Sequence, residues 1–207
     1  MHGRMRIHHL ALVAGLLAPG LAHGGGVIEG FWGIARPPAA DFESAVSGAQ
    51  DPHVFKDSLQ NAGGDLLIDL RPLELGAIVD LSWANDSASL TALGALLGFK
   101  LDVAGLRLDL LGEVGGHRFG NFAKDPAVIT SSDADEWLAY VGLRPGIAVQ
   151  LGKSRGLLLG VWTFARWDLT TQNVPLTVSG VGGAATDGTV KLGGTSIGAT
   201  LRVGYAF

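Results

Sequence analysis

The chain has 207 residues, with 19 acidic and 15 basic side chains and a formal net charge of −4. This charge argues against a nucleic-acid partner, because proteins that bind nucleic acid present a basic surface. The absence of cysteine excludes disulfides, thiolate catalysis and cysteine-based metal sites. The length is that of a single domain.

Residues 1–22 have the pattern of a secretory signal peptide. Arg4 and Arg6 precede an apolar run over residues 10–17, and Gly20-Leu21-Ala22 supplies the small residues of a cleavage site. His23-Gly24-Gly25-Gly26 ends the run well short of the roughly 20 apolar residues of a membrane helix. We therefore expect a signal peptide over residues 1–22 and a mature domain over 23–207. The mature domain keeps 13 basic and 19 acidic side chains, a net charge of about −6.

Apolar residues alternate with small or charged ones along most of the mature chain. Mean hydropathy is +0.33, yet no stretch after residue 22 is long and apolar enough for a membrane helix. In residues 195–207 the odd positions are mostly apolar, whereas the even ones are small or, at Arg202, charged. A period of two is typical of a β-strand with two different faces. The same pattern predicts strands at 27–35, 64–72, 76–84, 91–102, 105–118, 136–150, 156–169 and 195–207.

The connections predict how these eight strands are arranged. Short turns at Leu75-Gly76, Ala104-Gly105 and residues 152–155 alternate with links that are mostly long, at 36–63, 119–135 and 170–193. Short turns on one rim and long loops on the other are expected of an antiparallel up-and-down transmembrane β-barrel. The small and charged residues Ser179 to Gly194 suggest a mobile loop.

A soluble, lipocalin-like barrel would show the same alternation with its apolar face turned inward. Two features favour the membrane barrel. The polar face is rich in glycine and carries both charge signs, which suits a narrow lumen. Aromatic residues also lie near both ends of the strands, as in the girdles at the two membrane interfaces. They are Trp83, Trp137 and Trp167 near the long loops, and Tyr205 and Phe207 at the other end.

The last strand also resembles a known family. Leu201, Val203, Tyr205 and the final Phe207 are similar to the C-terminal assembly signal of bacterial outer-membrane proteins. With eight strands, the chain resembles the OmpA/OmpX-like small outer-membrane β-barrels. The resemblance implies contact with outer-membrane lipid, insertion by the barrel-assembly machinery through the C-terminal strand, and both termini in the periplasm.

The polar face carries acids and bases in equal number. Because an unpaired ion away from water costs several kcal/mol, such a balance favours ion pairs that fill the lumen. The predicted network is Glu29, Asp69, Asp80, Asp102, Asp109 and Glu113 with Arg71, Lys100, Arg107, Arg144, Arg166 and Arg202.

The charges also predict the register of two hairpins. With Ala104-Gly105 as a two-residue turn, Asp102 faces Arg107 and Lys100 faces Asp109. The alternative that shifts this pairing by two residues opposes like charges, which is unfavourable.

The charges predict the register of the second hairpin as well. With Leu75-Gly76 as its turn, Arg71 lies opposite Asp80.

These features favour a structural or surface-interaction barrel with a mostly plugged interior, no enzymatic activity and no cofactor. A ligand outside the cell would bind the loops 36–63 and 170–193. A narrow channel for ions or small solutes is the first alternative, and a lipid-modifying enzyme is the second.

Chemistry-bearing residues outside the predicted network are few. His117 is expected to face inward as the partner of an acid, and Ser131 and Ser132 to be solvated in a loop. The acidic run Asp133-Ala134-Asp135-Glu136 lacks the ligand spacing of a calcium site.

Overall fold

The structure is a computed structural model of the chain. It describes residues 25–38, 41–44, 55–85, 87–120, 129–131, 136–152, 155–179 and 185–207. The signal peptide predicted over residues 1–22 lies outside the described residues. No helix in the described part of the chain is long and apolar enough to cross a membrane.

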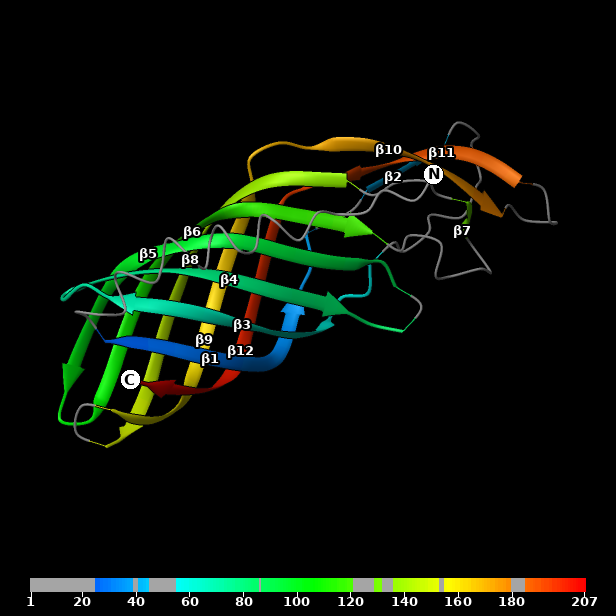
Figure 1. Cartoon of the computed structure of the whole chain (residues 1–207). Helices are drawn as coiled ribbons and strands as arrows, with labels where there is room; N and C mark the ends of the chain where they lie inside the picture. Colours follow the sequence, from blue (N-terminus) through cyan, green and yellow to red (C-terminus); the bar gives the residue numbers. More distant parts are fainter. Residues whose placement is uncertain are drawn as a thin grey trace, which may run out of the picture.

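Eight antiparallel strands form a closed barrel (Figure 1). Each strand pairs with its neighbour along the chain, and the first strand pairs with the last, so the predicted eight-stranded barrel is confirmed. Closure leaves no unpaired strand edge, which is what a sheet needs in hydrocarbon. The strands are β1 (Gly26–Arg36), β3 (Leu59–Asp69), β4 (Leu73–Trp83), β5 (Ser89–Val103), β6 (Leu106–Gly120), β8 (Glu136–Leu151), β9 (Gly156–Asp168) and β12 (Thr195–Ala206).

The apolar face of the barrel points outward. On β12, Leu201 and Val203 are 62% and 54% exposed, whereas Arg202 between them is 1% exposed. Large apolar side chains are exposed in the same alternating manner around the barrel, and most of the charged side chains of its strands are buried inside. A soluble barrel has the opposite arrangement, so the fold is that of a membrane barrel. On β9 the alternation also turns Trp162 and Phe164 inward.

The β5–β6 hairpin has the predicted register. Asp102 pairs with Arg107 and Lys100 with Asp109. The two turn residues, Ala104 and Gly105, both have positive φ, of 51° and 85°. This left-handed conformation matches the twist of the strands, and glycine adopts it at little cost.

The predicted register of the β3–β4 hairpin is wrong. Its turn lies at residues 70–72, where the backbone N–H of Leu70 donates to the carbonyl of Leu73 at 2.8 Å. Asp80 therefore lies opposite Gly63 and not opposite Arg71. The physical reason is Pro72, which has no N–H for a sheet ladder and so ends the strand before the expected turn. As a result β3 begins at Leu59, within the predicted loop 36–63.

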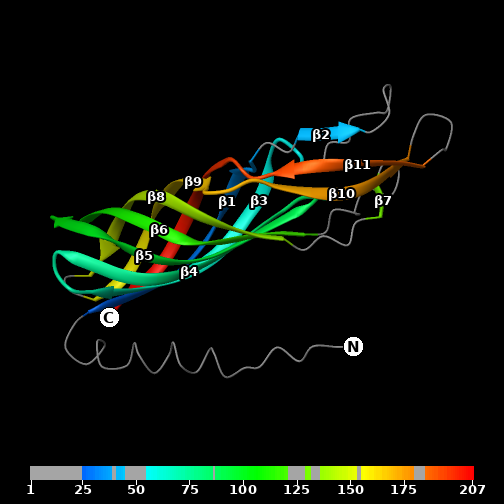
Figure 2. The same cartoon turned by 90° about the horizontal axis from the view of Figure 1, so that it is seen from above.

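A second sheet extends beyond the long-loop ends of the barrel strands (Figures 1 and 2). Its strand order is β2 (Asp41–Ser44), β11 (Ala185–Leu192), β10 (Gln172–Ser179) and β7 (Ile129–Ser131). The prediction of a mobile loop over residues 179–194 is therefore wrong for β11, because this strand is paired with β10 along its whole length.

The β10–β11 hairpin packs against the long-loop ends of barrel strands. Its inward residues form one buried apolar cluster with residues at the ends of those strands. The cluster comprises Val174, Leu176, Val190 and Leu192 of the hairpin with Ala88, Leu90, Phe119 and Leu138, and Phe55 packs against it.

The outward face predicts how sensitive the barrel is to charge. Leu97→Arg, in the middle of β5, is expected to destabilise the barrel by about 2–4 kcal/mol, because it places a guanidinium in hydrocarbon. Val103→Arg, at the end of the same strand and similarly exposed (53% against 57% for Leu97), is the matched control and is expected to cost at most about 1 kcal/mol. Urea unfolding in lipid vesicles measures both. Equal losses would contradict a membrane-spanning β5.

Candidate functional site

The charged interior is organised in two chains of ion pairs, and the first lies nearer the short-turn rim. Arg107 of β6 pairs with Glu74 of β4, and its Nε donates to Asp109 Oδ1 at 2.7 Å. Arg202 of β12 continues the chain, since its Nη2 donates to Asp109 Oδ2 at 2.6 Å and its Nη1 lies 3.5 Å from Glu29 Oε1. Acids and bases thus alternate from Glu74 to Glu29.

The second chain lies nearer the long loops. Arg166 of β9 donates from Nε to Glu113 Oε2 at 2.5 Å and from Nη1 to Asp80 Oδ2 at 2.8 Å. Arg144 of β8 lies 3.5 Å from Glu113 Oε1 and 3.8 Å from Asp65 Oδ2. This chain runs Asp65, Arg144, Glu113, Arg166, Asp80 and also begins and ends with an acid.

Asn61 extends the second chain. Its side-chain amide donates to Asp80 and, at 2.9 Å, to the Ser82 hydroxyl.

Aromatic rings separate the guanidinium groups. The Arg202 guanidinium carbon lies 4.1 Å from the ring centroid of Trp162, and that of Arg144 lies 4.4 Å from Phe31. Arg166 lies 4.3 Å from Phe164. The Trp162 indole N–H donates to Glu29 Oε2 at 2.8 Å. Cation–π contacts of this kind stabilise an arginine that has left water.

Glycines on the facing strands make room for these rings. A Cβ atom at Gly146 would lie 2.1 Å from the Trp162 ring, and one at Gly198 would lie 2.3 Å from Phe164. The glycine-rich interior is therefore filled by large aromatic and arginine side chains, and these glycines do not enclose an open lumen.

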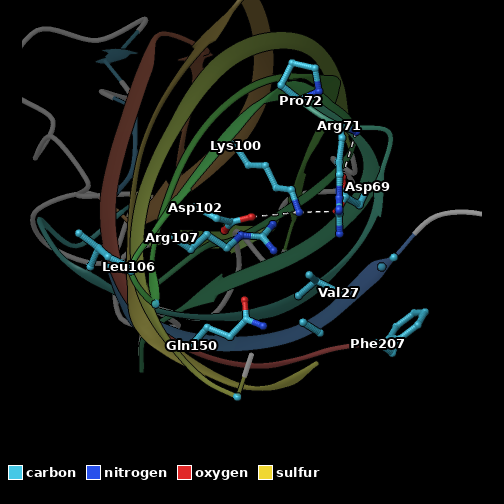
Figure 3. A pocket seen from close by; sticks show the side chains of 16 residues that line it. Val27, Asp69, Arg71, Pro72, Lys100, Asp102, Leu106, Arg107, Gln150 and Phe207 are labelled. Atoms are coloured by element: carbon cyan, nitrogen blue, oxygen red, sulfur yellow. Dashed lines mark hydrogen bonds and ion pairs between the residues drawn. The ribbon is translucent and has the colours of Figure 1, made fainter. Parts of the chain in front are cut away.

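A cavity of about 750 Å³ lies at the short-turn rim (Figure 3). Lys100 pairs there with Asp69 and lies 3.4 Å from Asp102, and Arg71 Nε lies 3.3 Å from Asp69 Oδ2. Arg107 lines the inner part of the cavity. The first and last described residues, Gly25 and Phe207, line its mouth, so both ends of the described chain lie on this rim.

A buried histidine joins the barrel to the base of the β10–β11 hairpin. His117 Nδ1 lies 2.6 Å from Asp168 Oδ1, and the backbone N–H of Gly194 donates to Asp168 Oδ2 at 3.1 Å. The His117 ring is stacked on Tyr140 with 4.2 Å between ring centroids. The expected acidic partner of His117 is thus Asp168. Residues 132–135 lie outside the described residues, so Ser132 and most of the acidic run are not placed.

The structure places ten of the twelve predicted network residues inside the barrel. The predicted position of Arg71 inside the barrel is wrong, because this residue lies in the β3–β4 turn with 78% of its side chain exposed. Asp102 lies at the cavity mouth with its side chain 49% exposed. Asp65 and Glu74 are buried acids that the predicted network lacks.

A sequence signal was available for both missed acids. Asp65 lies four residues before Asp69 and so faces the same side of its strand. Glu74 lies six residues before Asp80 and faces the same side as Asp80 once the turn is placed at Pro72.

The predicted aromatic residues and the residues of the assembly signal all face outward. This holds for Trp83, Trp137, Trp167, Leu201, Val203, Tyr205 and Phe207.

No family model and no curated protein matches the chain. Among solved structures, Neisserial surface protein A matches with a TM-score of 0.48 and 11% identity, over 86% of this chain and 96% of that one. The N-terminal β-barrel domain of Pseudomonas aeruginosa OprF matches with a TM-score of 0.49 and 15% identity, over 89% and 100%.

The second chain of ion pairs predicts that substitutions of two arginines differ greatly in their cost to the stability of the barrel. Arg166→Leu leaves Glu113 and Asp80 without their shared partner inside the barrel and is expected to cost about 3–5 kcal/mol of stability. Arg71→Leu removes an exposed ion pair and is expected to cost at most about 1 kcal/mol. Urea unfolding of both variants in the same vesicles tests this. Similar losses would argue against a buried network in β9.

Proposed function

We propose that the protein is a bacterial outer-membrane barrel with a closed interior and a structural or surface-interaction role. One observation carries the proposal: packed arginine and aromatic side chains fill the middle of the lumen. A buried apolar cluster packs under the β10–β11 hairpin at the long-loop end. The cavity at the short-turn rim ends against Arg107.

The orientation follows from the two rims. In this proposal the short turns and the described chain ends face the periplasm, and the second sheet faces outside. The partner then meets the surface built by β2, β11, β10 and β7, which belongs to the segments 36–63 and 170–193 together with β7. A paired sheet is a preformed surface, so a partner that binds it orders less chain than one that binds a disordered loop.

A narrow channel is the second candidate, favoured by the cavity that reaches Arg107 from the short-turn rim. Conduction would require the ion-paired arginines to part. Planar-bilayer conductance separates the two candidates. The closed barrel is expected to give no steady single-channel current. A variant in which a short glycine-serine link replaces residues 172–192 lacks the β10–β11 hairpin and is the control for the contribution of this hairpin to closure. Steady openings of the unmodified protein would replace the first proposal with the second.

A lipid-modifying activity is not favoured. Such an enzyme needs its catalytic groups where lipid reaches them, and the His117 ring is fully buried inside the barrel wall with Asp168 and Tyr140. Mass spectrometry of membrane lipids with and without the protein is expected to show no new species.

The C-terminal strand predicts an assembly defect. Phe207→Ala is expected to reduce severalfold the heat-modifiable, folded protein in the outer membrane. Phe207 follows β12, the strand that closes on β1, it exchanges backbone hydrogen bonds with Gly26, and it belongs to the residues that resemble the assembly signal. Leu151→Ala, another exposed apolar residue at the short-turn end, is the control and is expected to leave the amount nearly unchanged. Equal amounts of folded protein for both variants would count against recognition of the C-terminal residue.

A further inference from the structure

Two arginines are exceptions to the inward placement of charge on the barrel strands. Arg36 is the last residue of β1, and Arg118 lies two residues before the end of β6. Both side chains are exposed, on the same face as the large apolar residues of their strands. On the eight barrel strands, all of which the structure describes, every acid and every other base occupies an inward-facing position. The outward face of these strands therefore carries positive charge alone.

Both arginines lie at the long-loop end of the barrel, toward which β1 and β6 run (Figure 1). A charge on the lipid-facing side of a barrel is costly at the middle of the bilayer and costs little near the interface. A long arginine side chain keeps its methylene groups on apolar surface while its guanidinium reaches the polar layer. Arg36 and Arg118 are thus placed where a positive charge meets lipid headgroups.

Arg118 lies in a row of three outward-facing side chains that can donate hydrogen bonds. Its cross-strand partners are Thr91 on β5 and Trp137 on β8. The Trp137 ring lies over Gly116, where a Cβ atom would come within 2.9 Å of it. Because Gly116 is two residues nearer the middle of β6, the ring lies on the hydrocarbon side of Arg118. Tryptophan is typical of the membrane interface, so this arrangement sets the guanidinium at headgroup level.

The chemistry of this row fits a phosphate group. A guanidinium donates through a planar fork that matches the oxygens of a phosphate. An indole N–H acts only as a donor, and a threonine hydroxyl can also donate. The molecules that surround the wall of a membrane barrel are lipids, and their anionic group is a phosphate.

We propose that Thr91, Arg118 and Trp137 bind the phosphate of an anionic lipid headgroup in the leaflet at the long-loop rim. Leu93, which is exposed two residues nearer the middle of β5 than Thr91, offers apolar surface to the acyl chains of the same lipid. The inference rests on the membrane barrel of the proposed function. It depends neither on a closed lumen nor on a partner of the second sheet.

Arg36 belongs to a different place on the barrel wall. It lies on β1, four strands from β6 in the closed order of the barrel. Its cross-strand partner on β12 is Ile197, which is apolar and exposed. Arg36 thus offers a cation without the neighbouring donors of the Arg118 row, which makes it the matched control for that row.

Native mass spectrometry of the purified barrel with two lipids tests the proposal. Phosphatidylglycerol has an anionic headgroup, and phosphatidylcholine with the same acyl chains has a zwitterionic one. Each lipid is titrated into the same detergent micelles. The unmodified protein is expected to bind its first phosphatidylglycerol at least about fivefold more tightly than its first phosphatidylcholine, the factor that one basic residue near a membrane surface supplies.

The variants separate the row from the general charge of the rim. Arg118→Gln is expected to lose most of the preference for phosphatidylglycerol and to bind phosphatidylcholine as before. Arg36→Gln removes the same charge at the same rim and is expected to keep most of the preference. If Arg118→Gln yields too little folded protein, Trp137→Phe is measured instead. This variant keeps the ring without the N–H donor and is expected to weaken the binding of phosphatidylglycerol alone.

Inorganic phosphate in excess is the second probe. It is expected not to displace the bound lipid, because it makes no contact with the apolar wall. Three outcomes would overturn the proposal: equal affinity of the unmodified protein for the two lipids, equal losses in Arg36→Gln and Arg118→Gln, or displacement of the lipid by inorganic phosphate. Each of them would leave the closed lumen untouched, because that proposal is tested by conductance.

Discussion

The narrow lumen of an eight-stranded barrel is the constraint on which the rest of the structure depends. Such a lumen is only wide enough for side chains to fill it. An inward side chain therefore meets residues from across the barrel as well as from the next strand. Arg166 of β9 reaches Asp80 of β4, and Arg202 of β12 reaches Asp109 of β6. Ion pairs across the lumen connect strands that are far apart in the barrel wall.

The same constraint explains what the sequence could predict. The period of two is local, so eight strands, the outward apolar face and the inward charges could be predicted from single segments. Partners across the lumen could not, because they depend on the three-dimensional closure. Lys100, predicted opposite Asp109, does lie there in register, yet its ammonium pairs with Asp69 and Asp102.

The errors have local causes. The β3–β4 turn was placed at Leu75-Gly76 because a leucine and a glycine between two alternating runs resemble a tight turn, whereas Pro72 was the stronger signal. That shift removed Glu74 from the predicted interior and put Arg71 into it. With Asp65 and Glu74 included and Arg71 excluded, acids outnumber bases in the described interior.

The long-loop end of the barrel depends on apolar packing, whereas the interior depends on ion pairs. A β10–β11 hairpin could not be predicted from a segment rich in glycine, alanine and threonine, because its stability comes from the apolar residues that pack on Leu90, Phe119 and Leu138. Tertiary burial overrides weak local preference in this way for many strands. The hairpin thereby combines two tasks, since its inner face packs on the ends of barrel strands and its two strands form the middle of the second sheet.

A charged interior also specifies the register of the barrel. Because the outside is apolar, a shift by one residue of a strand that carries a buried arginine would move that arginine into hydrocarbon, at about 2–4 kcal/mol near the bilayer centre. A shift by two residues keeps the faces but opposes like charges, as it would set Lys100 against Arg107. Ion pairs that contribute little net stability, because desolvation offsets their attraction, can still exclude these alternatives. On this argument Arg144, Arg166 and Arg202 favour one register of the strands that carry them.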